Sequence, residues 1–144
     1  MYIAFRHLHS FTAYVALTFI ALAVLWAFFG WLKQRPFTKA SKTIAILGLI
    51  SAHLQMIFGL ALYFISPLGF SAISSEAMEN STLRLYFLEH PLMMIIAIGL
   101  ITVGYSKAKR MTDSQKKFNR IAIFYSLGLL LILLRIPWSV WLTL

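Results

Sequence analysis

The sequence predicts an all-α integral membrane protein, a four-helix up-down bundle that forms one domain over residues 1–144. Hydrophobic residues make up 60% of the chain and charged residues only 12%, whereas soluble domains carry about 25% charged residues. The few charges gather in short blocks between long apolar runs. This grouping is typical of membrane-spanning helices joined by short loops.

The apolar runs predict the four helices at residues 3–32, 43–65, 81–106 and 119–141. Each run reaches the roughly 20 residues that a helix needs to cross a bilayer. Arg35 precedes Pro36, and a residue before proline is disfavoured in a helix, so the first helix should end there. No small-residue cleavage site precedes Lys33. We therefore interpret the first run as a retained helix rather than a signal peptide.

Prolines and capping residues shape the second half of the chain. Asn80, Ser81 or Thr82 can cap the start of the third helix. Pro91 lies inside that helix and predicts a kink. Pro137 interrupts the fourth helix near its end.

The basic residues predict the orientation of the chain, with both ends on the non-cytoplasmic side. Loop 66–80 contains Glu76 and Glu79 and no lysine or arginine. Ten of the 13 basic residues instead lie in or beside the first and third loops: Lys33, Arg35, Lys39, Lys42, Lys107, Lys109, Arg110, Lys116, Lys117 and Arg120. Since cytoplasmic loops carry the excess of lysine and arginine, both loops should be cytoplasmic. The net charge of +9 therefore indicates that the partner of the basic loops is the lipid bilayer of a bacterial cytoplasmic membrane and not a nucleic acid.

The chain contains no cysteine. This excludes disulfides, thiolate metal sites, cysteine-ligated iron–sulfur clusters and the covalent attachment of c-type haem. A haem in this protein would have to be held without covalent bonds.

Ionisable groups inside the expected helices are the candidate functional residues, because they are costly in a bilayer and usually face the bundle interior. They are His9, His53, Glu89, His90 and Arg135, with His7 and Arg84 nearer the outer interface. The rise of 1.5 Å per residue places His9, His53, His90 and Arg135 in the outer half of the bilayer. We expect these four helices to bring their polar groups together at similar depth.

Helical spacing predicts which way these side chains point. His9 heads a seam of small residues that includes Ala13 and Ala16, and such seams let helices approach closely, so His9 should face inward. His7 heads a bulkier face that suits lipid or the interface. The direction of His53 is less defined, because the neighbouring stripe on its helix is the one with small residues.

A porphyrin between helices needs imidazole ligands, small residues beside the ring and a cation near its propionates. We expect two axial ligands drawn from His9, His53 and His90, with Arg135 pairing with a propionate. Two haems would need four ligands, including His7.

Each of these residues also has a structural interpretation. His53 and His90 can form hydrogen bonds between helices, and His7 can be an ordinary interfacial residue. Arg135 can form a buried ion pair with Glu89. Both interpretations remain open at the level of the sequence.

Four short motifs carry a family resemblance: His7-Leu8-His9-Ser10, His53-Leu54-Gln55, Glu89-His90-Pro91 and Arg135-Ile136-Pro137-Trp138. Together they resemble a group of small bacterial four-helix membrane proteins described as cytochrome b-like. The resemblance implies a bundle that carries haem b and a link to respiratory electron transfer, with these histidines as the haem-binding positions. The chain lacks the paired histidines at two depths of one helix that dihaem cytochromes b have.

Three functions compete at this stage. The first is an electron carrier or redox sensor with one haem b near the outer face. The second is a proton relay or porphyrin-free metal site built from Glu89, His90, His53 and Arg135. The third is a structural or assembly subunit of a respiratory membrane complex, and the chain could also form a homo-oligomer. No nucleophile–base pair or nucleotide-binding motif is evident, so we expect no independent catalytic activity.

Overall fold

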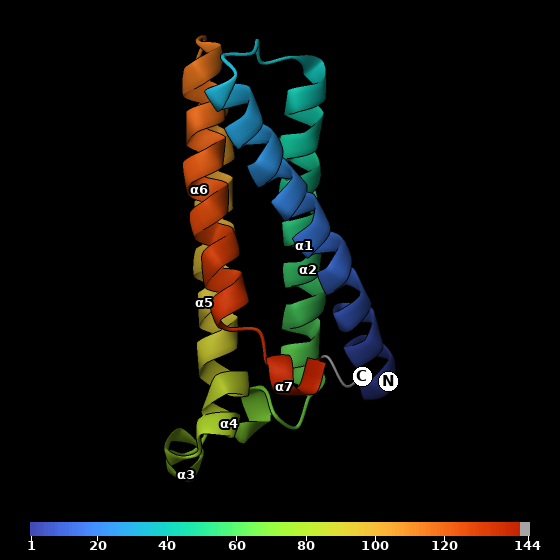
Figure 1. The fold of residues 1–144 in the computed structure, drawn as a ribbon. Helices are drawn as coiled ribbons and strands as arrows, with labels where there is room; N and C mark the ends of the chain where they lie inside the picture. Colours follow the sequence, from blue (N-terminus) through green and yellow to red (C-terminus); the bar gives the residue numbers. More distant parts are fainter. Residues whose placement is uncertain (142–144) are drawn as a thin grey trace.

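The computed structural model describes residues 1–141, and all of its regular secondary structure in that range is helical (Figure 1). Four helical segments are long and apolar enough to cross a membrane. They are α1 (Tyr2–Leu32), α2 (Lys39–Ile65), a composite segment (Ser81–Lys109) and α6 (Ser114–Leu134). The prediction of four long helices is therefore confirmed.

The composite third segment consists of three helical pieces in sequence. These are α4 (Ser81–Arg84), the π-helical turn η2 (Leu85–Glu89) and α5 (His90–Lys109). The π-helical turn directly precedes Pro91, so the irregularity expected at this proline takes the form of a widened turn. Short elements flank the long ones: η1 (Phe70–Ala72) and α3 (Ser75–Glu79) in the second loop, and α7 (Trp138–Trp141) after α6.

Successive long helices run in alternating directions along the bundle (Figure 1). α1 packs mainly against α2 and α6, and α5 packs mainly against the same two helices. α1 and α5 are therefore diagonal partners across the bundle. The two loops rich in basic residues lie together at one end, and the N-terminus and α7 lie at the other (Figure 1).

The first basic loop begins with a Schellman motif. Gln34 has a left-handed backbone, with φ of 50°, and its N–H donates to the Trp31 carbonyl over 3.3 Å. The Arg35 N–H donates to the Gly30 carbonyl over 2.9 Å. These two bonds satisfy carbonyls that a helix end leaves unpaired. α1 ends at Leu32, four residues before Pro36, and this is the end predicted from the sequence.

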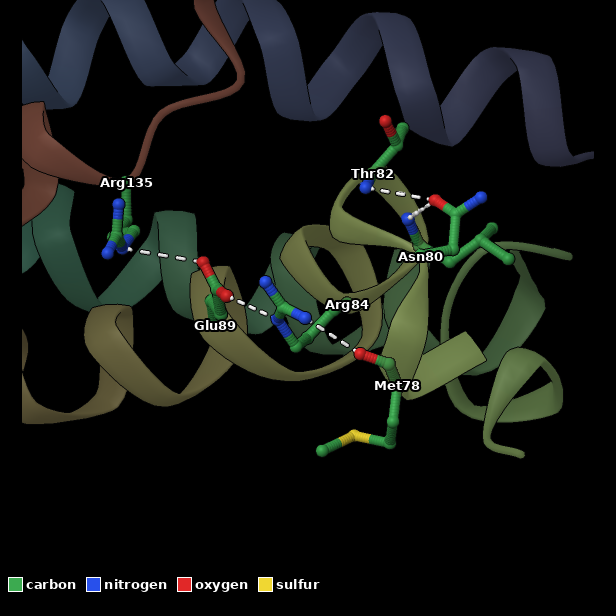
Figure 2. A network of polar contacts seen from close by, with 7 residues as sticks. Met78, Asn80, Thr82, Arg84, Glu89 and Arg135 are labelled. Atoms are coloured by element: carbon green, nitrogen blue, oxygen red, sulfur yellow. Dashed lines mark hydrogen bonds and ion pairs between the residues drawn. The ribbon is translucent and has the colours of Figure 1, made fainter. Parts of the chain in front are cut away.

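Side chains cap the starts of the later helices. Asn80 accepts hydrogen bonds from the backbone N–H groups of Thr82 and Leu83, which selects it among the three expected caps (Figure 2). Asp113 accepts a bond of 2.7 Å from the Lys116 N–H and starts α6. α6 therefore begins five residues before the predicted start at residue 119.

α6 also ends earlier than predicted, at Leu134 rather than at residue 141. Pro137 has no N–H and cannot donate to the carbonyl of Leu133, four residues back. The indole N–H of Trp138 donates to that carbonyl instead, over 2.9 Å. The chain then turns into α7, where Trp141 stacks on Tyr14 of α1 with ring centroids 4.4 Å apart.

Close helix contacts at small residues hold the bundle together. Tyr125 of α6 is completely buried, and its hydroxyl donates to the Ala45 carbonyl of α2 over 2.7 Å. Gly128 of α6 faces α5 so closely that an added Cβ would lie 2.9 Å from the Ala97 carbonyl oxygen. By contrast, many large apolar side chains on the outer faces are exposed. Close helix contacts at small residues, combined with large apolar side chains on the outer faces, are typical of helix packing in lipid.

Candidate functional site

A cavity of about 260 Å³ lies between the helices in the half of the bundle that carries the N-terminus and α7. Its wall is mostly apolar and includes small residues such as Ala13, Ala52 and Gly59. Polar groups interrupt this wall in a few places, among them Arg6, His9, Gln55, Tyr63 and His90. Ligand sites typically combine an apolar wall with a few convergent polar groups. This cavity is the candidate functional site.

Two of the predicted histidines meet at this cavity. The imidazole rings of His9 on α1 and His90 on α5 have centroids 6.4 Å apart and an interplanar angle of 88°. The rings come from diagonal helices, so they approach one another across the middle of the bundle. The inward direction expected for His9 agrees with this position.

The π-helical turn and the end of α6 position His90. Its Nδ1 donates a hydrogen bond of 2.7 Å to the backbone carbonyl of Arg135. A carbonyl accepts only from a protonated nitrogen, so in the neutral ring Nε2 keeps its lone pair. Because Pro91 cannot donate to the Phe87 carbonyl, the hydroxyl of Tyr63 donates to it over 3.0 Å. Tyr63 thus compensates for the proline beside His90.

Gln55 of α2 positions His9. The side-chain amide nitrogen of Gln55 lies 2.9 Å from the His9 carbonyl and 3.0 Å from His9 Nδ1. Thr12 donates to the amide oxygen of Gln55 and so supports this orientation. The carbonyl contact requires the nitrogen of the amide to face His9, and in this orientation His9 Nδ1 accepts a hydrogen bond from the Gln55 amide N–H.

Gly59, also on α2, makes room for the His9 ring. An added Cβ at Gly59 would lie 3.0 Å from Cε1 of His9. That distance is shorter than a comfortable carbon–carbon contact. A side chain at position 59 would therefore compete with the imidazole for the same space.

The other two histidines do not line the cavity. His53 Nδ1 donates to the Leu49 carbonyl of its own helix over 2.9 Å, and its Nε2 lies 3.4 Å from the Thr102 hydroxyl of α5. This placement corresponds to the interhelical interpretation of His53. His7 is exposed on the outer face of α1, as its position on the bulkier face suggested.

Arg135 does not line the cavity. It belongs to an ion-pair network with Glu89 and Arg84 (Figure 2). Its Nε lies 3.6 Å from one carboxylate oxygen of Glu89, while Arg84 Nε donates to the other over 2.9 Å. Arg84 also donates from Nη1 to the Met78 carbonyl over 2.7 Å. The ion pair between Arg135 and Glu89 that the sequence allowed is thus present, but it is not buried, because 46% of the Arg135 side chain and 28% of the Glu89 side chain are exposed. What Arg135 contributes to the cavity is its backbone carbonyl, through His90.

Arg6 is the cationic side chain that lines the cavity, and the sequence analysis did not single it out. Its Nε is shielded from solvent and has no hydrogen-bond partner within residues 1–141. Arg6 lies three residues before His9, so the two share one face of α1. That spacing was the available signal in the sequence.

Gln55 and Gly59 also escaped the sequence analysis as site residues. Their roles depend on α1 and α2 lying side by side, which sequence spacing within one helix does not reveal. Within the described part of the chain, no three histidine, aspartate or glutamate side chains gather closely enough to hold a metal ion by themselves. A metal in this cavity would have to bring further ligands of its own.

Comparison with known proteins does not supply a family. The sequence matches no protein-family model, and searches of curated proteins and of solved structures found no significant match.

Proposed function

We propose that this chain is a b-type cytochrome that binds one haem b non-covalently between His9 and His90 and takes part in electron transfer or redox sensing. The supporting observation is the approach of two imidazoles from diagonal helices across one apolar cavity, with centroids 6.4 Å apart. Two imidazoles that bind one iron from opposite sides, with bonds of about 2 Å, have ring centroids roughly 6 Å apart. An interplanar angle of 88° allows both ring planes to contain a common axis.

The surroundings of the two imidazole rings also suit a bound haem. His90 donates from Nδ1 to a carbonyl, which is the usual arrangement of a metal-binding histidine and leaves Nε2 as the ligand. His9 needs one adjustment: the Gln55 amide must rotate so that its oxygen accepts from Nδ1–H. The rotation gives up both contacts of the amide nitrogen to His9 and replaces them with the bond from Nδ1–H. The Thr12 hydroxyl, 3.3 Å from the His9 carbonyl oxygen, remains as a donor to that carbonyl.

The chain's own residues would hold the haem and exclude water from it. His9 and His90 supply the ligands, small residues such as Ala13 and Ala52 leave space for a flat ring, and the apolar wall keeps the surroundings dry. Bound haem supplies reversible one-electron chemistry. A wall with few polar groups favours the iron state of lower net charge, so the lining also tunes the reduction potential.

We further propose that the protein spans a bacterial cytoplasmic membrane with both ends outside. The support is that the two basic loops lie at one end of the bundle (Figure 1), because such loops are retained in the cytoplasm. The cavity then lies in the outer half of the bilayer. A respiratory membrane complex is the partner that this location would suit.

An absorption spectrum of the detergent-purified protein, oxidised and then reduced, tests the haem proposal. We expect a Soret band that shifts on reduction, and haem that an acidic organic solvent extracts completely because no cysteine binds it. The proposal would be refuted if fully folded protein, mixed with haem and then separated from unbound haem, shows no Soret band. That result would favour the structural or assembly role, which co-purification with a respiratory complex would then support.

A further inference from the structure

We propose that Arg6 is the carboxylate-binding residue of the cavity, so that the cavity takes ligands that join an apolar body to a carboxylate. The identification of this carboxylate as a haem propionate rests on the proposed function. A long-chain fatty acid presents the same chemistry. The inference concerns Arg6 itself and can be tested with either ligand.

The first support is the state of the Arg6 side chain. Its Nε is inaccessible to solvent and unpaired within residues 1–141, although it lines a cavity. A guanidinium is permanently charged, and a buried donor without a partner is costly. An acceptor that enters the cavity would remove this cost.

The second support is the distribution of negative charge. The chain has only four acidic residues, Glu76, Glu79, Glu89 and Asp113, and none of them lines the cavity. Glu89 is paired with Arg84 and Arg135, and Asp113 caps α6 at the opposite end of the bundle. The remaining two are exposed in the second loop. The charge of Arg6 is therefore left for a ligand to neutralise.

The third support is geometry along α1. Arg6 precedes His9 by three residues, about 4.5 Å along the helix axis, and both side chains line the cavity. The remaining wall is mostly apolar. A ligand that reaches His9 with an apolar body would therefore carry its carboxylate about one helical turn closer to the N-terminus.

Haem titration of the purified full-length protein tests this inference. Haem b is compared with its dimethyl ester, which lacks free carboxylates, for the wild type and for Arg6→Gln, Arg6→Lys and Arg84→Gln. A charge-assisted hydrogen bond corresponds to about a tenfold to hundredfold change in affinity. We expect Arg6→Gln to weaken haem binding by that factor and to leave ester binding unchanged. Arg6→Lys should recover part of the loss, and the control Arg84→Gln should behave like the wild type.

Two outcomes of the titration would overturn the inference. One is an equal loss of haem and ester binding in Arg6→Gln, because a purely structural role would affect both ligands. The other is unchanged haem binding in Arg6→Gln, because Arg6 would then not bind the carboxylate.

A second measurement separates this inference from the haem proposal. If the wild type binds neither porphyrin, the proposed function fails, and native mass spectrometry with oleate and oleyl alcohol then tests Arg6. A preference for oleate that Arg6→Gln abolishes supports the inference with a fatty acid as the ligand. Equal binding of the two, or binding of neither, would overturn it.

Discussion

His90 of α5 donates a hydrogen bond from Nδ1 to the backbone carbonyl of Arg135, across 2.7 Å. The carbonyl is available because α6 ends at Leu134, and the last carbonyls of a helix have no partner within the helix. Pro137 causes this end. A proline just after one helix thus leaves a carbonyl available to a histidine on another helix. Because Nδ1 of His90 donates to this carbonyl, Nε2 of the neutral ring keeps its lone pair.

The first prediction separates the histidines that line the cavity from the one that does not. His90→Ala and His9→Ala should each remove one iron ligand, shift the Soret band and lower the haem content of the purified protein. His53→Ala should leave the spectrum unchanged, because His53 bonds to Leu49 on its own helix. The measurement is the absorption spectrum at equal protein concentration.

His53→Ala is also the matched control, since it removes the same imidazole side chain from another of the four long helices. If His53→Ala loses the haem spectrum and His9→Ala keeps it, the ligand assignment is wrong. If all three variants keep the wild-type spectrum, none of these residues is a ligand.

The second prediction concerns Gln55, which contacts His9 at two atoms. Gln55→Leu removes the partner of the imidazole while keeping a side chain of similar size. Replacing the group that orients a metal ligand typically costs about tenfold to a hundredfold in affinity, so haem should dissociate more readily. The dissociation rate can be measured by transfer of haem to an excess of apomyoglobin.

Thr12→Val provides the control for Gln55, because Thr12 contacts the Gln55 amide and not the His9 ring. Its effect on haem dissociation should be smaller than that of Gln55→Leu. A Gln55→Leu protein that releases haem at the wild-type rate would show that Gln55 does not orient His9.

The number of helices and the inward direction of His9 could be predicted because both depend on local patterns. Apolar run length predicts a membrane-spanning helix, and the seam of alanines after His9 marks the face that packs. The seam residues Ala16, Ile20 and Ala23 are buried in the structure. Periodicity along one helix was sufficient for these inferences.

The partners of the site residues could not be predicted, because they depend on the relative rotation of different helices. Gln55 reaches His9 across 46 positions in the sequence, and His90 reaches Arg135 across 45. Depth estimates placed His53 with His9 and His90, but depth alone does not specify direction around the helix. His53 Nδ1 donates to the carbonyl of Leu49 on its own helix, and this contact turns one edge of the ring toward the backbone.

The third prediction compares two glycines in helices. A Cβ at Gly59 would press on the His9 ring at 3.0 Å, whereas a Cβ at Gly99 would have no neighbour within 4 Å. Replacing glycine by valine changes the intrinsic helix propensity equally at both positions, so Gly99→Val controls for that change. Gly59→Val should displace His9 and weaken haem binding, and Gly99→Val should not. Equal haem affinity of the two variants would show that the His9 ring does not depend on the space at Gly59.

The fourth prediction tests the orientation of the chain. Because the chain has no cysteine, an introduced cysteine is its only thiol that can be labelled. Ser75 and Thr112 are both exposed, in the second and third loops respectively, so each can carry a single cysteine without disturbing the bundle interior. In intact cells, a membrane-impermeant maleimide should label Ser75→Cys and leave Thr112→Cys unlabelled until the membrane is disrupted. The reason is that the third loop holds the basic residues that favour the cytoplasm. Labelling of Thr112→Cys alone in intact cells would reverse the orientation and place the His9–His90 cavity in the inner half of the bilayer.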